Sequence, residues 1–504
     1  MRKIGWMALA VLALGACSQQ KGAQSAADDG AADAATEAGD SNTADAKSDG
    51  AVRPPLDPYP STYQRYPGAS VLITGATLLT GTGERIDNGA VLLENGKITA
   101  VGAAGAMTVP EGTTTIDAAG KWVTPGIIDI HSHLGDYPSP SDASTSDGNE
   151  VTSPNTAHVW AEHSVWPQDA GFTRALAGGI TSLQVLPGSA NLFGGRSAIL
   201  KNVPSRTVQG MKFPDAPYGL KMACGENPKR VYGERGGPGT RMGNMAGYRA
   251  AWIEASGYKK KWDDYWRDYD EWANDDSDDK ADKAPEAPTR DLKLETLAGA
   301  LRGEININMH CYRADEMVQV LDMAKEFGYK VRTFHHAIEA YKVADYLAQN
   351  NVCAAMWADW WGFKLEAFDT VSENVALVHN QPNGCAIVHS DSAIGIQRLN
   401  QEAAKAMAAG RRIGIAIEPK DAIVWLTANP AKAMDIVDQT GTLEAGKMAD
   451  VVIWNRNPFS VYAKAEKVYI DGALMFDRSD PKISPRMDFE IGQRDNGFTG
   501  GAGQ

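Results

Sequence analysis

The spacing of apolar residues divides this chain into three parts. From about residue 70 to 123, and again from 450 to 472, short apolar runs alternate with glycine-containing turns, as in β-rich domains. Between these ends, residues 124–435 alternate strand-length apolar runs with stretches of helical periodicity. The pattern therefore predicts a small β domain built from both ends of the body, and an α/β part between them.

Individual strands can be placed in the two ends. Asn95-Gly96 separates two apolar runs and predicts a tight hairpin. The expected strands cover residues 69–73, 89–93, 97–101, 450–454 and 467–472.

The middle part alternates predicted strands and helices, which indicates parallel βα units. Its length of about 300 residues, with polar chemistry at strand ends, favours a (β/α)8 barrel over an open sheet. We expect strands at 180–186, 330–334 and 385–388, and helices at 172–178, 315–327, 338–349 and 396–409.

An insertion at residues 227–292 interrupts this alternation. It contains glycine-rich turns, a predicted helix at 245–272 and an acidic, proline-containing loop at 275–288. The helix carries four tryptophans, which we assign to its apolar face, with a substrate lid as the alternative. These residues are Trp252, Trp262, Trp266 and Trp272.

The first 17 residues form a targeting segment. Arg2 and Lys3 precede a short apolar run that ends in Leu-Gly-Ala-Cys, which resembles a bacterial lipobox with Cys17 as the lipidated residue. Ordinary secretion is the alternative. Residues 18–66 are predicted to be a disordered tether, and residues 481–504 a tail. We expect a lipoprotein of the cell envelope, facing the periplasm from the outer membrane if the cell is Gram-negative.

The charge balance and the cysteines bear on the expected partners and on disulfide formation. The 504 residues include 49 basic and 63 acidic side chains and show no basic stripe, so nucleic acid is not an expected partner. Four cysteines in apolar contexts are interpreted as buried free thiols, with disulfides open in an oxidising compartment. They are Cys224, Cys311, Cys353 and Cys385.

The first candidate for chemistry is the stretch TPGIIDIHSH at residues 124–133. His131 and His133 stand two residues apart at the end of an apolar strand, so both imidazoles face the same side. A pair of histidines that simply closes a strand is the alternative. A metal site requires further ligands from elsewhere in the chain.

Further candidates also lie at predicted strand ends. His310, His336 (with His335 beside it) and Asp391 each follow an apolar run. The carboxyl ends of barrel strands meet on one face, so these residues can share one centre with the first pair. Imidazole and carboxylate ligands suit a divalent metal, with zinc as the default.

This order of residues resembles the amidohydrolase superfamily, and within it the imidazolonepropionase-like and prolidase-like enzymes. The resemblance also rests on ANPA at 428–431 and GTLEAGKMADVVIW at 441–454, and it covers about residues 70–478. It implies a (β/α)8 barrel at 124–435. It also implies a β-sandwich formed by 67–123 together with 436–480, and a metal-dependent enzyme.

The resemblance assigns metal ligands residue by residue. It matches His131, His133, His310, His336 and Asp391, with Asp391 also moving the proton. His336 is preferred to His335 because His336-Ala-Ile-Glu fits the family pattern.

Two residues compete for the position between two metals. Lys221, as a carboxylated lysine, is favoured, and Glu226 at the strand end is the alternative. A site with one metal that uses neither residue is also open.

The sequence thus predicts a hydrolase that cleaves a C–N bond of an amide, cyclic amide or peptide-like small molecule by metal-activated hydroxide. The alternatives are a mononuclear ring-opening or deaminating enzyme and a catalytically silent binding protein. His335, His389 and Arg196 are expected near the ligands or the substrate, with Arg196 able to pair with a substrate carboxylate. The resemblance also makes a homo-oligomer possible.

Overall fold

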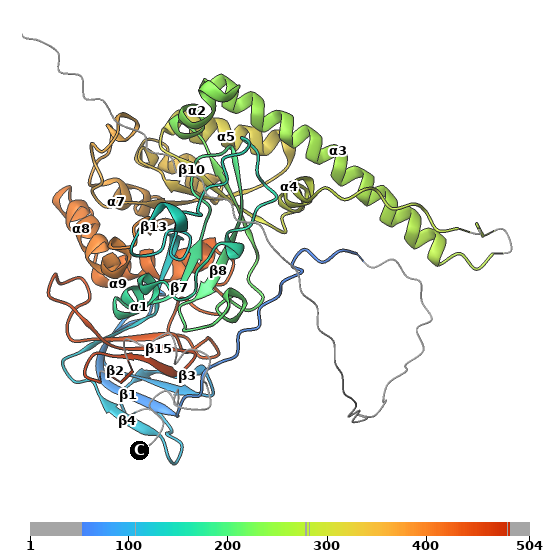
Figure 1. Cartoon of the computed structure of the whole chain (residues 1–504). Helices are drawn as coiled ribbons and strands as arrows, with labels where there is room; N and C mark the ends of the chain where they lie inside the picture. Colours follow the sequence, from blue (N-terminus) through green and yellow to red (C-terminus); the bar gives the residue numbers. More distant parts are fainter. Residues whose placement is uncertain (1–52, 106, 278–279, 282, 481, 484–504) are drawn as a thin grey trace, which may run out of the picture. The chain divides into compact units, whose positions relative to one another are not determined.

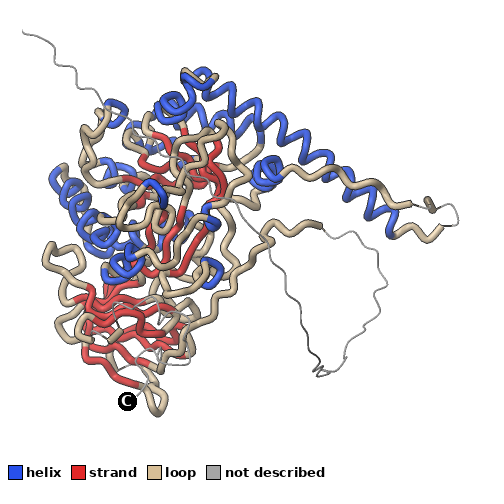
Figure 2. The backbone as a smooth tube through the Cα atoms, in the orientation of Figure 1, coloured by secondary structure: helices blue, strands red, loops and turns tan. Residues whose placement is uncertain are grey.

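The computed structural model describes residues 53–105, 107–277, 280–281, 283–480 and 482–483. The predicted signal segment with Cys17, residues 18–52 of the predicted tether and nearly all of the predicted tail lie outside the described residues. Figures 1 and 2 show a β-rich part and a larger α/β part in the described chain.

The α/β part is built on an eight-stranded sheet in the order β6 to β13. Asp391 N donates to His131 O at 3.0 Å, and Ser390 donates to Asp129, so the segment after β13 is joined to β6 and the barrel is nearly closed. The strands are β6 Ile127–Ser132, β7 Ile180–Val185, β8 Phe193–Lys201, β9 Gly219–Ala223, β10 Asn306–Cys311, β11 Val331–His336, β12 Cys353–Met356 and β13 Ala386–Val388.

One strand departs from the predicted all-parallel barrel. β8 runs antiparallel to both β7 and β9. Only residues 186–192 connect β7 to β8, which is too short for a parallel crossover and sufficient for a hairpin. Residues 193–196, the second part of a glycine-rich stretch at 188–196, therefore belong to a buried strand.

Helices pack on the outside of these strands, as α7 and α8 do on β13 (Figure 1). The predicted helix at 338–349 is shorter than expected: a 3-10 turn at Ala340–Lys342 occupies its first part, and the non-helical Val343 (φ −133°) separates this turn from α6. The helices are α1 Ala170–Ala177, α2 Glu226–Tyr232, α4 Leu292–Arg302, α5 Ala314–Phe327, α6 Ala344–Gln349, α7 Asn374–His379, α8 Leu399–Arg412, α9 Pro419–Ala422 and α10 Ala428–Ala433.

The insertion contains a long helix, α3 Arg241–Ala273, which runs beside α4 and whose far end reaches away from the barrel (Figure 1). Thr240 caps its first turn. Trp252 and Trp262 are buried, and Trp266 and Trp272 pack against the same core, which confirms the predicted apolar face. No helix in the described part of the chain is both long and apolar enough to span a bilayer.

Strands from the two ends of the body join in one sheet. β5 from the first end pairs antiparallel with β14 from the second, and Asn95-Gly96 makes the predicted hairpin with φ of 50° and 81°. β1 pairs with β4 in its first half and with β5 in its second, so the sheet branches there. The strands are β1 Val71–Leu79, β2 Arg85–Glu94, β3 Lys97–Ala103, β4 Thr114–Asp117, β5 Trp122–Pro125, β14 Val451–Trp454, β15 Ala465–Ile470 and β16 Ala473–Asp477.

Residues 53–66, placed in the predicted tether, instead lie against the folded body. Lys212 Nζ contacts Asp57 Oδ2 at 2.8 Å, and Tyr63 OH donates to Asp471 Oδ2 at 2.6 Å. Asp471 also pairs with the fully buried Lys201 at 2.8 Å. Buried lysines thus fix a segment whose composition alone predicts disorder.

The four cysteines form two disulfides, so the prediction of free thiols is wrong. Cys224–Cys311 joins the ends of β9 and β10, and Cys353–Cys385 joins the starts of β12 and β13. Each pair lies on neighbouring strands. Sequence separations of 87 and 32 residues gave no spacing signal for these pairs.

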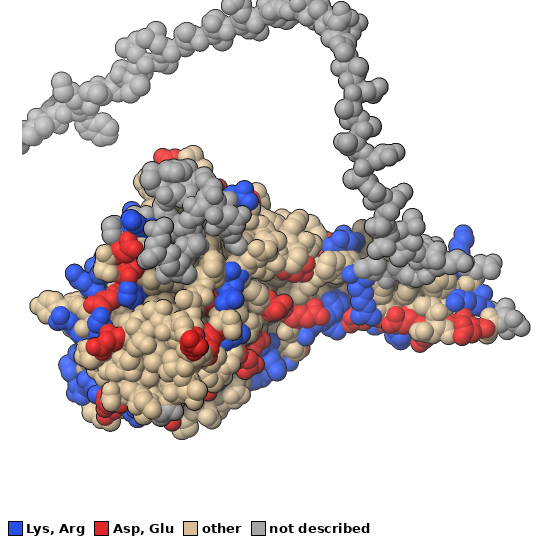
Figure 3. Space-filling view, turned by 90° about the horizontal axis from the view of Figure 1, so that it is seen from below, with Lys and Arg blue, Asp and Glu red and all other residues tan. Residues whose placement is uncertain are grey.

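Acidic and basic side chains are interspersed on the face shown in Figure 3, over α3 as well as the rest of the body. This face therefore offers no basic stripe of the kind that binds nucleic acid.

Candidate metal centre

The barrel brings the predicted ligands to one end of its sheet. His131 and His336 lie at or near the ends of β6 and β11, and His310 lies at the end of β10. Asp391 follows β13, and its backbone N–H is bonded to the carbonyl of His131 at 3.0 Å. Residues more than 250 positions apart in the printed sequence thus meet at one place, as strand-end placement predicts.

Two overlapping groups of side chains could each hold a metal ion. His131, His133 and Asp391 form the first group, and His131, His336 and His389 form the second, with potential ligand atoms within 4.8 Å of one another in each. Asp391 Oδ1 lies 3.2 Å from His133 Nε2 and 3.6 Å from His131 Nε2. His131 belongs to both groups, so its loss would affect both.

His310 is adjacent to these groups. Its ring centroid is 4.5 Å from that of His336, although its nitrogen atoms fall outside both groups. His389, predicted only as a nearby residue, is itself in the second group.

Several ring nitrogens at this place have no hydrogen-bond partner among the described residues. They are His310 Nδ1, His336 Nδ1 and both ring nitrogens of His389. Burial lowers the pKa of His310 and His336 well below the usual value, and that of His389 to about 3. Buried, neutral and unpaired imidazoles are costly unless something binds them, and the neutral form is the one that ligates metal. The residues therefore fit a metal ion.

The orientation of His131 is set by a chain of hydrogen bonds beneath it. Asn308 Nδ2 donates to Asn306 O at 3.2 Å, which points Asn308 Oδ1 at His335 Nε2 at 3.0 Å. His335 Nε2 must then carry the proton, and its Nδ1 accepts from His131 Nδ1 at 2.9 Å. His131 Nε2 is left unprotonated and faces the centre, where Lys221 Nζ lies 3.2 Å from it.

His133 is oriented in the same way by a carbonyl. Its Nδ1 donates to Leu186 O at 2.7 Å, which turns Nε2 toward Asp391 Oδ1 at 3.2 Å. Both ring nitrogens of His335, in contrast, are hydrogen-bonded, to Asn308 and to His131, and the side chain is fully buried. His336 lies in the second group of potential ligands, and His335 lies in neither group.

Lys221 and Glu226 lie in different surroundings. Lys221 is fully buried on β9, and its Nζ is 3.2 Å from His131 Nε2. Burial lowers the pKa of Lys221 to about 7, so much of this amine is neutral at neutral pH. Glu226 begins α2 and contacts Lys364 Nζ at 3.3 Å at the pocket wall.

Arg196 does not face this centre. It pairs in register with Leu220, the neighbour of Lys221, so its side chain leaves the opposite face of the sheet. It donates to Thr296 Oγ1 at 2.9 Å and Leu56 O at 2.7 Å, and lies 4.1 Å from the centroid of Trp160. The expectation that Arg196 contacts the substrate at this site is therefore wrong.

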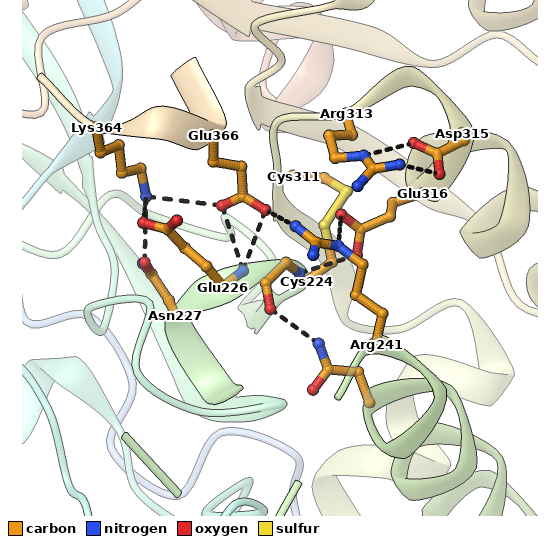
Figure 4. A network of polar contacts seen from close by, with 12 residues as sticks. Cys224, Glu226, Asn227, Arg241, Cys311, Arg313, Asp315, Glu316, Lys364 and Glu366 are labelled. Atoms are coloured by element: carbon orange, nitrogen blue, oxygen red, sulfur yellow. Dashed lines mark hydrogen bonds and ion pairs between the residues drawn. A yellow bond between two sulfur atoms is a disulfide. The ribbon is translucent and has the colours of Figure 1, made fainter. Parts of the chain in front are cut away.

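The ligand candidates open into a pocket of about 390 Å³. Helix α2 and several loops supply lining residues that no signal in the sequence indicated, because their positions depend on how these segments fold over the end of the barrel. These residues are Tyr137, Asn149, Asn227, Arg230, Tyr312, Phe363 and Lys364. Figure 4 shows Lys364 beside Glu226 and Asn227.

The backbone is unusual at this place. His336 and Asp391 both have left-handed conformations, with φ of 69° and 48°. Such strain costs free energy, and it is found more often at functional sites than elsewhere. It turns both side chains toward the pocket that they line.

The chain is similar to known amidohydrolases. The sequence pattern described as "Amidohydrolase family" matches residues 387–476. Amidohydrolase tasK of Hapsidospora irregularis is 32% identical over 410 residues, which cover 78% of this chain and 40% of that protein. This chain therefore spans about two fifths of the length of that relative.

A solved structure extends the comparison to a whole relative. The crystal structure of an amidohydrolase from Thermotoga maritima MSB8 is 34% identical, with a TM-score of 0.71, and the match covers 81% of this chain and 100% of that one. An imidazolonepropionase from Acidiphilium cryptum (strain JF-5) is 43% identical over 49 residues, which are 10% of this chain and 12% of that protein. With a relative of this identity matched along its entire length, the chain belongs to the amidohydrolase family.

Proposed function

We propose that this protein is a metal-dependent hydrolase that cleaves the C–N bond of an amide, a cyclic amide or a small peptide. One observation carries the proposal: neutral histidines with unpaired nitrogens converge with a carboxylate in a single pocket. Family membership supports hydrolysis, and the pocket suits a small molecule.

The residues that would hold the metal are those of the two groups, with His310 beside them. Imidazole nitrogens and one carboxylate are ligands that zinc accepts, so zinc is the first candidate. Lys221, placed against His131, is our candidate for the residue between two metals. A neutral amine can add to carbon dioxide and lose a proton to give a carbamate, whose oxygens can bind metal where an ammonium cannot.

Asp391 is the proposed proton carrier. Burial would raise its pKa, but the hydrogen bond and charge of His133 outweigh that effect and lower it, so the group is ionised at neutral pH. A metal held by these residues would lower the pKa of water toward about 7 and would polarise the carbonyl. Asp391 then accepts the proton of the attacking water and gives it to the leaving nitrogen, which would otherwise depart poorly.

The test is Asp391→Asn. We expect the variant to keep a folded site and to retain bound metal, but to lose most of its turnover, about 100-fold or more. Asp435→Asn, at an exposed surface pair with Arg332, is the matched control and should leave turnover unchanged. Normal turnover in Asp391→Asn would remove the proposed role.

A mononuclear ring-opening or deaminating enzyme is the alternative. The first group alone offers three ligand atoms, enough for one catalytic metal. Metal content near one per chain, unaffected by Lys221→Met, would favour it.

We also propose that the chain is a lipoprotein of the cell envelope, anchored through Cys17. The lipobox-like LGAC at 14–17 supports this. Radiolabelled palmitate should be incorporated into the wild-type chain and not into Cys17→Ala.

A further inference from the structure

The pocket beside the histidines carries positive charge from two elements. Lys364 Nζ lies 4.1 Å from the ring centroid of Tyr312, 3.2 Å from Asn227 Oδ1 and 3.3 Å from Glu226 Oε1. Its side chain is only 18% exposed. Arg230 lines the same pocket one helical turn after Glu226, on the same side of α2.

Lys364 is held in place by a polar network around its loop (Figure 4). Glu366 accepts hydrogen bonds from Glu226 N at 3.1 Å and from Arg241 at 2.5 Å. Arg241 also donates to Glu316 at 2.9 Å, and Glu316 accepts from Gly225 N at 3.1 Å. The loop after β12 is therefore fastened to α2 and α3, and Lys364 needs little reorganisation to meet a ligand.

Arg230 differs from Lys364 because no acidic side chain in the described part of the chain pairs with it. It is exposed and makes no hydrogen bond or ion pair with the described part of the chain. Lys364 and Arg230 give this pocket two positive charges, and Glu226 and Asp391 give it two negative ones. Asp391 contacts His131 and His133, and Glu226 contacts Lys364. Arg230 and Lys364 are thus the cationic side chains of this pocket, and a substrate carboxylate is a group that both can bind.

We propose that Lys364 and Arg230 form a carboxylate-binding subsite, and that the substrate is an amide that carries a carboxylate, as an N-acyl amino acid or dipeptide does. The rings of Tyr312 and Phe363 give the subsite an apolar wall for the substrate's side chain. The inference rests on the proposed hydrolase function for its chemistry, but carboxylate recognition can be tested separately.

The test compares pairs of amides that differ only in the carboxylate. N-acetyl-L-phenylalanine is paired with N-acetylphenethylamine, and N-acetyl-L-leucine with its decarboxylated analogue, using metal-loaded protein. We expect kcat/KM to favour the carboxylate by about 10- to 100-fold, the size of a charge-assisted contact. Lys364→Met should remove most of this preference, and Lys364→Arg should restore it.

Two further variants separate recognition from folding. Arg230→Met should reduce the preference without disturbing the network, since Arg230 makes no hydrogen bond or ion pair with the residues that the structure describes. Lys229→Met is the matched control: it is the preceding residue on α2, faces a neighbouring pocket, and should leave the preference unchanged. An equal preference in wild type, Lys364→Met and Arg230→Met would overturn the proposal.

Binding measured without turnover distinguishes the two ways to fail. In Asp391→Asn, calorimetry should show tighter binding of N-acetyl-L-phenylalanine than of N-acetylphenethylamine, and loss of that difference when Lys364→Met is added. If no amide is hydrolysed but this difference is present, the hydrolase proposal fails and the subsite stands. If both ligands bind equally, the subsite is wrong whether or not amides are hydrolysed.

Discussion

Asn308 lies beneath the histidines, and replacing it should weaken metal binding without removing a ligand. In Asn308→Leu, His335 Nε2 loses the acceptor that it now has at 3.0 Å. The proton must then stay on a buried nitrogen without a partner, or move to His335 Nδ1. In the second case His335 donates to His131, and His131 presents an N–H to the centre instead of a lone pair.

The two outcomes have similar magnitudes. A buried donor left without a partner costs about 1–3 kcal/mol. Loss of a residue that orients a metal ligand reduces metal affinity by about 10- to 100-fold, which is about 1.4–2.8 kcal/mol. We therefore expect the dissociation constant for metal to be about 10- to 100-fold larger in Asn308→Leu than in wild type. The unfolding free energy of the metal-free variant should fall by less than about 3 kcal/mol.

Competition with a chromophoric chelator measures this affinity. Asn400→Leu is the matched control, because Asn400 is also a buried asparagine, on α8, that donates a 2.7 Å hydrogen bond to Pro458 O. It should lose stability but keep its metal affinity. Wild-type affinity in Asn308→Leu, or an equal loss in both variants, would refute the assigned orientation of His131.

Three further outcomes are expected. Cys224→Ser should lower the unfolding free energy by about 4–5 kcal/mol, and Cys353→Ser should lower it by about 1 kcal/mol less, because the two disulfides close loops of 87 and 32 residues. Denaturant unfolding measures both losses, and equal losses would contradict the loop-length reasoning. The folded pKa of Lys221, about 7, is below its unfolded value of 10.5, so the unfolded chain binds more protons between these values. The unfolding free energy of metal-free protein should therefore rise with pH between about 7 and 10.5, by up to ~1.4 kcal/mol per unit relative to Lys221→Met, and parallel pH curves would exclude the lowered pKa. Lys201→Met should cost about 3–5 kcal/mol in a thermal or denaturant melt because it leaves two buried aspartates unpaired, whereas a loss below about 1 kcal/mol would show that these aspartates take up protons at little cost.

The periodic parts of the fold were predictable from the sequence. The alternation of apolar runs located many of the strands and half of the α-helices that the structure describes, and the Asn95-Gly96 turn indicated a hairpin. Histidines at predicted strand ends lie close together in the structure. These features depend on local chemistry or on the general geometry of strand ends.

Other features depend on contacts that no local pattern records. β8 is antiparallel because the connection before it is short, although its glycines favour a loop prediction. The disulfide partners are set by strand order, and residues 53–66 are ordered by lysines located more than 130 positions away. Lys364 and Arg230 reach the pocket from segments whose path the apolar pattern does not define.

The most direct test of the account is the metal content of purified, metal-supplemented protein, measured for wild type and His131→Ala by inductively coupled plasma mass spectrometry. His131 belongs to both ligand groups. We predict about two metal ions per wild-type chain, and loss of most of that metal in a folded His131→Ala. A folded His131→Ala with wild-type metal content, or a supplemented wild type that binds none, would contradict the proposed centre.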